Sequence, residues 1–166
     1  MRKAIAAAAL SVAAGAAALG IATSAAASTG TGTGTGTGTE HFSLISVSTN
    51  KSHVVFSAIA AGRFTAGGTA VMTGKVVTLR FPAGTITLNV TNQHRTITSY
   101  PACLQTEASS GTFAIASGTG AYNRISGSGK STANITFVET MASGKCSDNT
   151  AAAQAIITAS GLVSLR

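Results

Sequence analysis

The sequence predicts an all-β domain built from short strands and many turns. Charged residues make up only 9% of the 166 residues, and the chain contains 19 Gly and no Trp. Apolar and polar residues alternate in many segments; Ile86, Leu88 and Val90, for example, are separated by Thr87 and Asn89. A period of two is typical of half-buried strands. Apart from the N-terminus, no segment has a helical period, so we expect a β-sandwich or a β-barrel.

Alternating segments recur at near-regular spacing along the chain, with turn residues such as Pro82-Ala83-Gly84 between them. We expect strands at residues 42–49, 54–60, 77–81, 86–91, 96–106, 113–115, 133–138 and 154–160. The length suits about eight strands, and closing them into a barrel would remove the exposed edges of a Thr-rich sheet.

The N-terminus, residues 1–27, has the pattern of a secretory signal peptide. Met1-Arg2-Lys3 is positively charged, the segment from Ile5 to Ala22 is apolar, and Ala25-Ala26-Ala27 provides an A-x-A site. We expect cleavage between Ala27 and Ser28 and release of the mature protein from the cell. The Ala-rich segment is only weakly apolar, so we expect no stable membrane insertion after cleavage.

A linker at residues 28–40 is expected to separate the signal peptide from a β-barrel domain at residues 41–166. Thr and Gly alternate strictly from Thr29 to Thr39. Ordering glycine costs more backbone entropy than ordering other residues, and this segment has no apolar side chain to bury. We therefore expect the linker to be disordered.

The formal net charge of +7 falls once the signal peptide is removed. Without Arg2 and Lys3, nine Lys and Arg residues stand against four Asp and Glu, for a net charge of about +5. The basic residues are scattered and few aromatic residues lie between them, unlike the pattern of nucleic-acid-binding proteins. We expect no nucleic-acid partner and interpret the charge as an aid to solubility.

Gly129-Lys130-Ser131 matches the end of a phosphate-binding loop, but its surroundings do not. The first glycine of such a loop would fall at position 124, which is Arg124. Residues 132–138 then alternate with a period of two, whereas the loop requires a helix N-terminus to hold its anion. We interpret the glycines as turn residues between strands.

Cys103 and Cys146 are the two cysteines of the chain. In an exported protein they are most simply one disulfide, whereas a reactive thiol would leave a second thiol exposed to oxidants. The disulfide would close a loop of more than forty residues. In a chain-entropy treatment, that constraint stabilises the fold by roughly 3–4 kcal/mol.

Few side chains qualify as catalytic or metal-binding groups. His41, His53 and His94 occur in no ligand motif, and no G-x-S-x-G motif is present, so we assign no metal, cofactor or catalytic residue. A glutamate facing an apolar cavity would have a raised pKa and could serve as a general acid. The candidates for polar groups of a cavity, each with the surface as the alternative, are Arg80, Glu107 and Glu139.

The segment from Gly111 to Lys130, GTFAIASGTGAYNRISGSGK, resembles the strand-turn-strand signature of the allene oxide cyclase/dirigent-like barrel group. Phe81-Pro82-Ala83-Gly84-Thr85, the two cysteines and the ending from Ile157 to Leu165 extend the resemblance. It covers most of the chain after Phe42 and is greatest to small exported proteins of actinobacteria. The resemblance implies an eight-stranded antiparallel barrel with a central cavity, often assembled as a homo-oligomer.

In such a barrel, glycines mark bends or places where a second backbone comes close. The glycines to which the resemblance gives this role are Gly118, Gly120, Gly127 and Gly129. The plant activities of the group, steering phenol coupling and closing an oxylipin ring, do not follow from it. The matching residues make turns, and a fold does not define a function.

We expect a secreted, non-enzymatic protein that binds a small apolar or phenolic ligand or has a structural role in the envelope. The alternative is a cavity enzyme of the cyclase, isomerase or coupling-directing type. An interior filled with side chains would favour the structural role. An apolar pocket with a few convergent polar groups would favour a binding protein or an enzyme.

Overall fold

The computed structural model describes residues 36–49 and 54–166. The predicted signal peptide, its cleavage position between Ala27 and Ser28, and His53 lie outside the described residues. The described part of the chain is all-β, as predicted, with eight strands, one 3-10 helix and no α-helix. Within it, no helix has the length and apolar character needed to cross a membrane.

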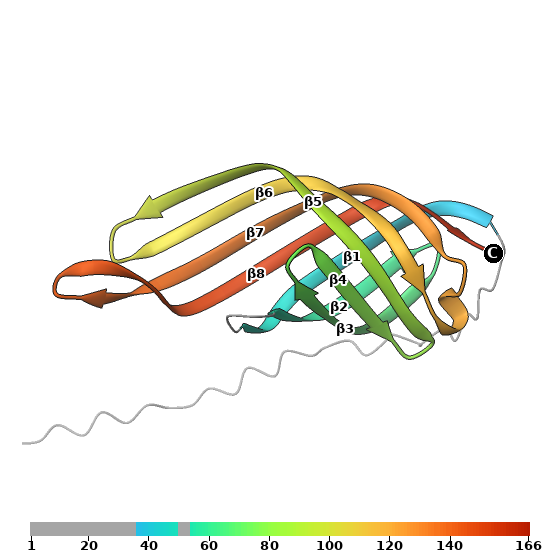
Figure 1. The fold of residues 1–166 in the computed structure, drawn as a ribbon, viewed down its shortest axis with the longest axis horizontal. Helices are drawn as coiled ribbons and strands as arrows, with labels where there is room; N and C mark the ends of the chain where they lie inside the picture. Colours follow the sequence, from blue (N-terminus) through green and yellow to red (C-terminus); the bar gives the residue numbers. More distant parts are fainter. Residues whose placement is uncertain (1–35, 50–53) are drawn as a thin grey trace, which may run out of the picture. The chain divides into compact units, whose positions relative to one another are not determined.

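The strands follow one another around a ring. The elements are, in order, β1 (Gly36–Thr49), β2 (Val54–Gly62), β3 (Thr65–Thr73), β4 (Val76–Phe81), β5 (Gly84–Tyr100), β6 (Leu104–Gly118), the 3-10 helix η1 (Gly120–Tyr122), β7 (Ser126–Ala142) and β8 (Lys145–Leu165). Each strand pairs with the next, and β8 also pairs with β1, which closes the antiparallel ring (Figure 1). The predicted arrangement of eight antiparallel strands is confirmed.

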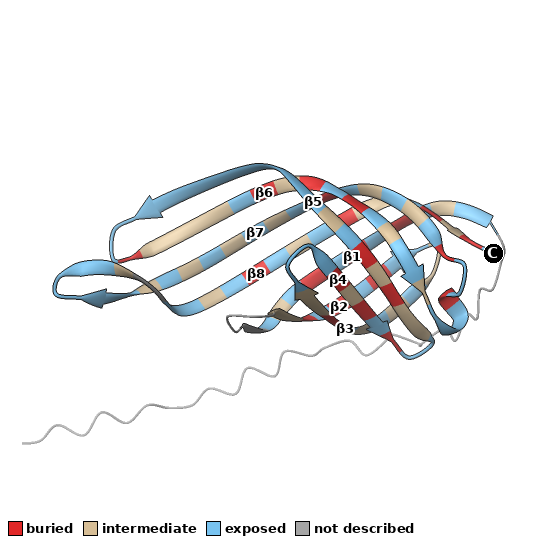
Figure 2. Cartoon of the chain, viewed as in Figure 1, coloured by how far each residue is buried: buried red, intermediate tan, exposed pale blue. Residues whose placement is uncertain are grey.

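Alternation along the strands places apolar side chains inside the ring. On β4, Val77, Leu79 and Phe81 are buried, whereas Val76 and Arg80 are exposed. Buried and exposed segments alternate in the same way along the strands of the ring in Figure 2. Because side chains of a strand point to opposite faces in turn, every second residue contributes to the interior.

β1 begins at Gly36, inside the segment expected to be a disordered linker. Residues 36–40 pair with β8, and Gly36 lies opposite Leu165. The glycines leave room for Arg63, which a Cβ atom added to Gly38 would contact at 3.4 Å. Arg63 Nε donates a hydrogen bond to the carbonyl oxygen of Gly36 at 3.2 Å. This part of the Thr-Gly pattern forms a strand because it pairs with β8, and the side chain of Arg63 occupies the space beside its glycines.

The strands differ from the sequence prediction at β3 and around the turn between β5 and β6, where the segments expected as three strands at residues 86–91, 96–106 and 113–115 form two. β3 is missing from that prediction because Gly67 and Gly68 interrupt the alternation. In the structure, a side chain at Gly68 would clash with the backbone of Arg80. The segment expected as one strand at residues 96–106 contains a turn between β5 and β6. Ala102 and Cys103 in this turn have φ angles of 62° and 60°, which end the strand.

Strands β5 to β8 continue past the ring as a four-stranded sheet, which we call the extension (Figure 1). β4 pairs with β5 no further than Asn89, and β1 pairs with β8 only from Ile156 onward. The extension consists of residues 90–100, 104–110, 132–142 and 145–155. In the described chain, its outer strands have no further strand beside them.

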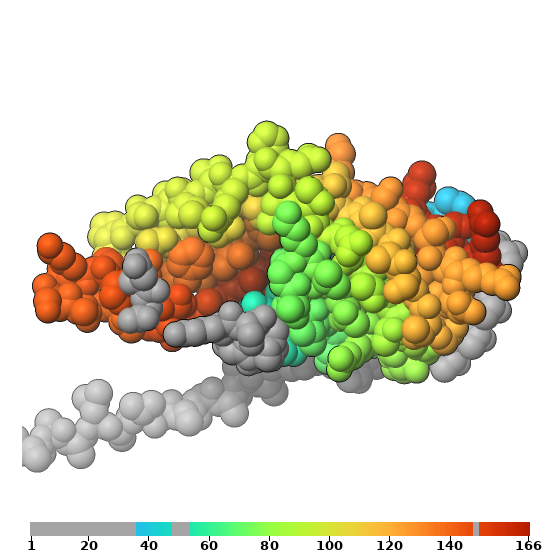
Figure 3. Space-filling view, in the orientation of Figure 1, coloured from blue at the N-terminus to red at the C-terminus, as the bar shows by residue number. Residues whose placement is uncertain are grey.

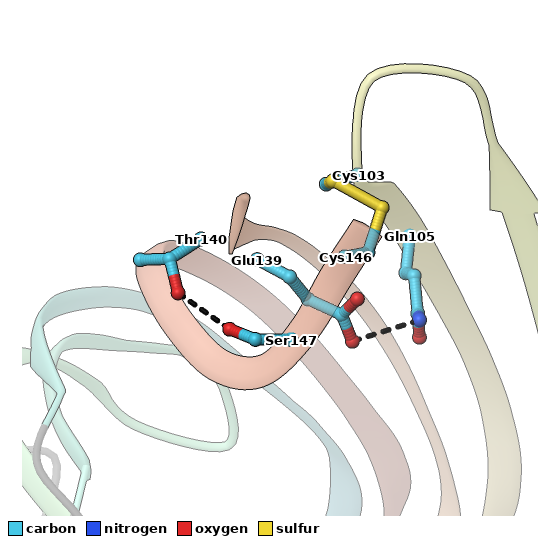
Figure 4. The surroundings of a disulfide bond; sticks show 6 residues. All are labelled: Cys103, Gln105, Glu139, Thr140, Cys146 and Ser147. Carbon is cyan, nitrogen blue, oxygen red and sulfur yellow. Dashed lines mark hydrogen bonds between the residues drawn. A yellow bond between two sulfur atoms is a disulfide. The ribbon is translucent and has the colours of Figure 1, made fainter. Parts of the chain in front are cut away.

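A disulfide between Cys103 and Cys146 lies at the far end of the extension, which confirms the predicted pairing (Figure 4). The Cα atoms are 5.3 Å apart, and the bond links the residue before β6 to the beginning of β8. Next to it, Gln105 Nε2 donates a hydrogen bond to Glu139 Oε1 at 2.8 Å. The disulfide and this hydrogen bond connect three strands where the ring no longer supports them.

The four glycines singled out by the resemblance lie against other backbone segments. A Cβ atom added to Gly118, Gly120, Gly127 or Gly129 would clash with the carbonyl oxygen of, respectively, Tyr122, Ala83, Leu162 or Ser160. Gly129 also faces Gly161 on β8, and each occupies space that a side chain on the other would need. Strands β7 and β8 therefore approach more closely here than side chains would allow.

Gly129→Ala should lower the free energy of unfolding by about 2 kcal/mol or more, because the new methyl group would overlap β8 and the ring of Phe113. Gly67→Ala is the matched control, since no atom lies within 4 Å of its added Cβ. The control should leave stability unchanged or raise it by up to about 1 kcal/mol. Urea denaturation measures both variants, and equal effects would contradict the predicted close approach.

Replacing Cys103 and Cys146 by serine should lower the free energy of unfolding by about 3–4 kcal/mol, because the bond constrains a loop with a sequence separation of 43. Urea denaturation of the double variant and of the wild type, with and without reductant, provides the measurement. Reduced wild type should match the double variant. A double variant as stable as the oxidised wild type would show that the disulfide does not stabilise the fold.

Candidate functional site

A cavity lies inside the ring, and all eight strands contribute to its lining. Its volume is about 110 Å³. Most of its lining is apolar, including Leu44, Phe56, Leu88, Phe113 and Ile157. Apolar cavities of about 150 Å³ hold a molecule of benzene, so this space suits a group of similar size, such as one small ring.

The polar end of the cavity lies where the ring passes into the extension. Asn92 on β5 and Glu107 on β6 line the cavity. Both residues belong to the extension, which begins past Asn89, the last residue of β5 that pairs with β4. Figure 3 shows the surface hollowed on this side, between the yellow-green atoms of β5 and the green atoms of β3 and β4. The orange atoms of β7 and β8 lie deeper in that hollow. A ligand can therefore approach from the side of the extension.

Glu107 is the one charged residue among the lining residues that the structure describes. Its Oε2 atom lies 2.7 Å from Nη2 of Arg95 on β5, in an ion pair that is also a hydrogen bond. The side chain of Glu107 is 11% exposed and that of Arg95 is 59% exposed. The carboxylate thus belongs to the cavity wall, whereas the guanidinium extends into solvent. This bond to Glu107 raises the pKa of Arg95.

The remaining polar lining residues are neutral. Ser109 on β6 and Ser131 on β7 are buried, and Asn92 and Thr132 complete the set. The cavity therefore combines an apolar body with a small group of hydrogen-bonding side chains, a combination common in small-molecule binding sites.

The structure separates the three charged candidates of the sequence analysis. Glu107 lines the cavity. Glu139 lies on β7 in the extension beside the disulfide, where Gln105 is its hydrogen-bond partner, and it does not line the cavity (Figure 4). Arg80 is exposed on the outer face of β4, because its neighbours Leu79 and Phe81 take the inward positions. Glu107 is thus the candidate that the fold brings to the cavity.

The two histidines that the structure describes do not line the cavity. His41 and His94 are exposed on β1 and β5. Among the described residues, no group of three His, Cys, Asp or Glu side chains is placed to hold a metal ion.

Five aromatic side chains fill the end of the ring opposite the extension. Tyr122 in η1 packs against Phe64 and Phe81, with ring centroids 4.9 and 5.9 Å apart. Phe42 continues the cluster to Phe64 and to Phe113, at 6.3 and 5.9 Å. Phe42 and Phe113 also line the cavity, so the cluster forms its floor. The aromatic packing leaves the extension side as the approach for ligands.

Glu40, a residue absent from the sequence-based candidates, is fully buried at this aromatic end. Its Oε2 accepts a hydrogen bond from the backbone N–H of Phe64 at 3.0 Å, and its Oε1 is buried without a partner. Burial raises the pKa of Glu40, although the backbone N–H groups of Phe64, His41 and Arg63 act in the opposite direction. Burial, and secondarily the charge of Glu40, raises the pKa of Tyr122.

The sequence contains a signal for Glu40 that the linker assignment conceals. Glu40, Phe42 and Leu44 are alternate residues of β1 and all are buried. Extending the alternation back by one step from Phe42 would have placed the carboxyl inside the ring. No comparable signal marks the ion pair of Glu107 with Arg95, because it depends on the pairing of β5 with β6.

Comparisons with known proteins do not add to this geometry. The chain matches no protein-family model, no curated protein and no solved structure. We therefore infer function from the cavity and its polar groups alone.

Glu40→Gln should stabilise the protein at alkaline pH. Because burial raises the pKa of Glu40, the folded protein holds this proton more tightly than the unfolded chain does. The stability that depends on protonated Glu40 is present at low pH and is lost as pH rises through the raised pKa. Glutamine keeps the shape without the charge.

We expect equal stabilities of wild type and Glu40→Gln below the ordinary glutamate pKa of 4.5. Around pH 8 the variant should be more stable by about 1–3 kcal/mol, the cost of a poorly satisfied buried polar group. Urea denaturation at a series of pH values measures the difference. A variant that is less stable at alkaline pH would mean that the three backbone N–H groups hold the carboxylate in its charged form.

Proposed function

We propose that the mature protein binds a small apolar ligand inside the ring and does not catalyse a reaction. One observation carries the proposal: a cavity of about 110 Å³ with a mostly apolar lining lies inside the ring. A ring with a purely structural role could fill its interior with side chains, as small barrels commonly do. The open volume therefore favours a binding role over a structural one.

The polar groups of the cavity favour binding over catalysis. Acid–base catalysis requires a group that can give up or take up a proton at the reacting atom. Among the described lining residues, Glu107 is the one carboxyl group, and Arg95 holds one of its oxygen atoms. A cyclase, isomerase or coupling-directing enzyme remains the second candidate, with Glu107 as its polar group.

We further propose that the protein is exported and belongs to the allene oxide cyclase/dirigent-like group. The disulfide supports export, because disulfides persist in oxidising compartments outside the cytosol. Eight antiparallel strands in a closed ring around a cavity support the grouping. A phenolic ligand and a homo-oligomeric state accompany this proposal, and both can be read from native mass spectrometry of the protein purified from culture medium.

Ala155→Leu should strongly weaken binding of a one-ring ligand. Ala155 lines the cavity on β8, and a leucine there would occupy the space that the ligand needs. Toluene is a suitable probe, and its Kd can be measured by NMR titration. We expect saturable binding to the wild type and at least about tenfold weaker binding to the variant, since filling the cavity removes the apolar area that the ligand buries.

Ala152→Leu is the matched control, because Ala152 is exposed on the same strand and does not line the cavity. This variant should bind toluene as the wild type does. Binding that survives in Ala155→Leu would place the ligand elsewhere. A wild type that does not bind toluene or any other one-ring apolar probe would refute the proposed function.

A further inference from the structure

We propose that the natural ligand carries a protonated amine on its apolar body, and that Glu107 recognises this group. The inference rests on the proposed function, since it names the chemical class of the ligand for the same cavity. Three features of the polar end of the cavity support it: the sign of its charge, the position of Arg95, and the neutral groups around Glu107.

The charge that faces the cavity is negative. Glu107 is the one charged member of the described lining, and its side chain is 11% exposed. A charge with so little water around it interacts more strongly with a ligand than a surface charge does, because the local dielectric is lower. A ligand that enters the cavity therefore meets the carboxylate of Glu107 directly, whereas its partner Arg95 is not among the lining residues.

Arg95 neutralises Glu107 from the solvent side and does not take its place in the cavity. The guanidinium is 59% exposed and bonds to Oε2. In the described chain, no donor is bonded to Oε1 of Glu107. Nor is this oxygen fully buried. One carboxylate oxygen is thus available to a ligand donor while the ion pair with Arg95 remains intact.

The neutral polar groups can complete the coordination of an ammonium. An ammonium has three N–H donors and no acceptor, so it needs several acceptors when it leaves water. Ser109 and Ser131 have hydroxyl oxygens and Asn92 has a carbonyl oxygen, all in the cavity lining. A carboxylate ligand would find donors in the same groups, but it would also face the charge of Glu107.

An anionic ligand inside the cavity would have the neutral polar groups as its donors, because Arg95 is not among the lining residues. The anion would also lie beside the carboxylate of Glu107, and two like charges in a partly buried site repel each other. A ligand amine instead adds a second cationic partner to a carboxylate that has an oxygen to spare. The cavity is therefore expected to bind a cationic head group more tightly than an anionic one.

Three probes of similar size test the inference: toluene, benzylamine and benzoate. Each has one ring, and at pH 7 they are neutral, cationic and anionic. We expect benzylamine to bind the full mature protein about tenfold more tightly than toluene, the gain from one charge-assisted hydrogen bond. Benzoate should bind more weakly than toluene. NMR titration or isothermal titration calorimetry gives the three Kd values.

Glu107→Gln should remove the tenfold advantage of benzylamine over toluene, and a circular dichroism spectrum like that of the wild type shows that the variant is folded. Glu139→Gln is the matched control, because it removes a carboxylate of the extension that does not line the cavity. The control should keep the order benzylamine, toluene, benzoate. Raising the salt concentration should reduce the advantage of benzylamine and leave toluene unaffected.

The outcomes separate the inference from the proposed function. Equal affinities for toluene and benzylamine, or an advantage of benzylamine that survives in Glu107→Gln, would overturn the inference and leave the binding role intact. Tighter binding of benzoate than of benzylamine would overturn it in favour of recognition by Arg95. Failure of all three probes to bind would instead refute the proposed function.

Discussion

The pairing of β1 with β8 is the constraint on which the rest of the molecule depends. Residues 36–45 of β1 lie opposite residues 156–165 of β8, and this contact turns a row of strands into a ring. Once the ring is closed, each strand has one face inside and one outside. A shift of one residue in this register would turn Glu40 and Phe42 to the outer face of β1 and His41 to the inner face. The cavity would then lose its aromatic floor.

The same constraint explains why the extension needs other support. Past Asn89 on β5 and Ile156 on β8, the outer strands no longer have a neighbour in the ring. The disulfide and the bond of Gln105 to Glu139 lie at the far end of this sheet, where the outer strands have no further strand beside them. Glu107 and Arg95 lie in the extension, between the ring and the disulfide, so the polar end of the cavity is supported from both sides.

Much of this fold could be predicted from the sequence, because alternation reports which face of a strand is buried. Val77, Leu79 and Phe81 were correctly grouped, and the pairing of the cysteines followed from their number. A linker assignment for the Thr-Gly segment leaves Glu40 unplaced, since the pairing of this segment with β8 and its contact with Arg63 form only in the folded ring. The open volume of the cavity was also unpredictable, because it depends on how side chains from eight strands meet.

Ring closure through β1 and β8 also sets the order of events during folding. The first and the last strand of the ring are far apart in the chain, and contacts of this kind are slow to form because a long loop must close first. The chain cannot complete its interior until β8 is available to pair with β1. Until then the apolar side chains of Phe42 and its neighbours remain exposed to solvent. Such exposure favours aggregation, so rapid pairing of β8 with β1 protects a chain of this topology.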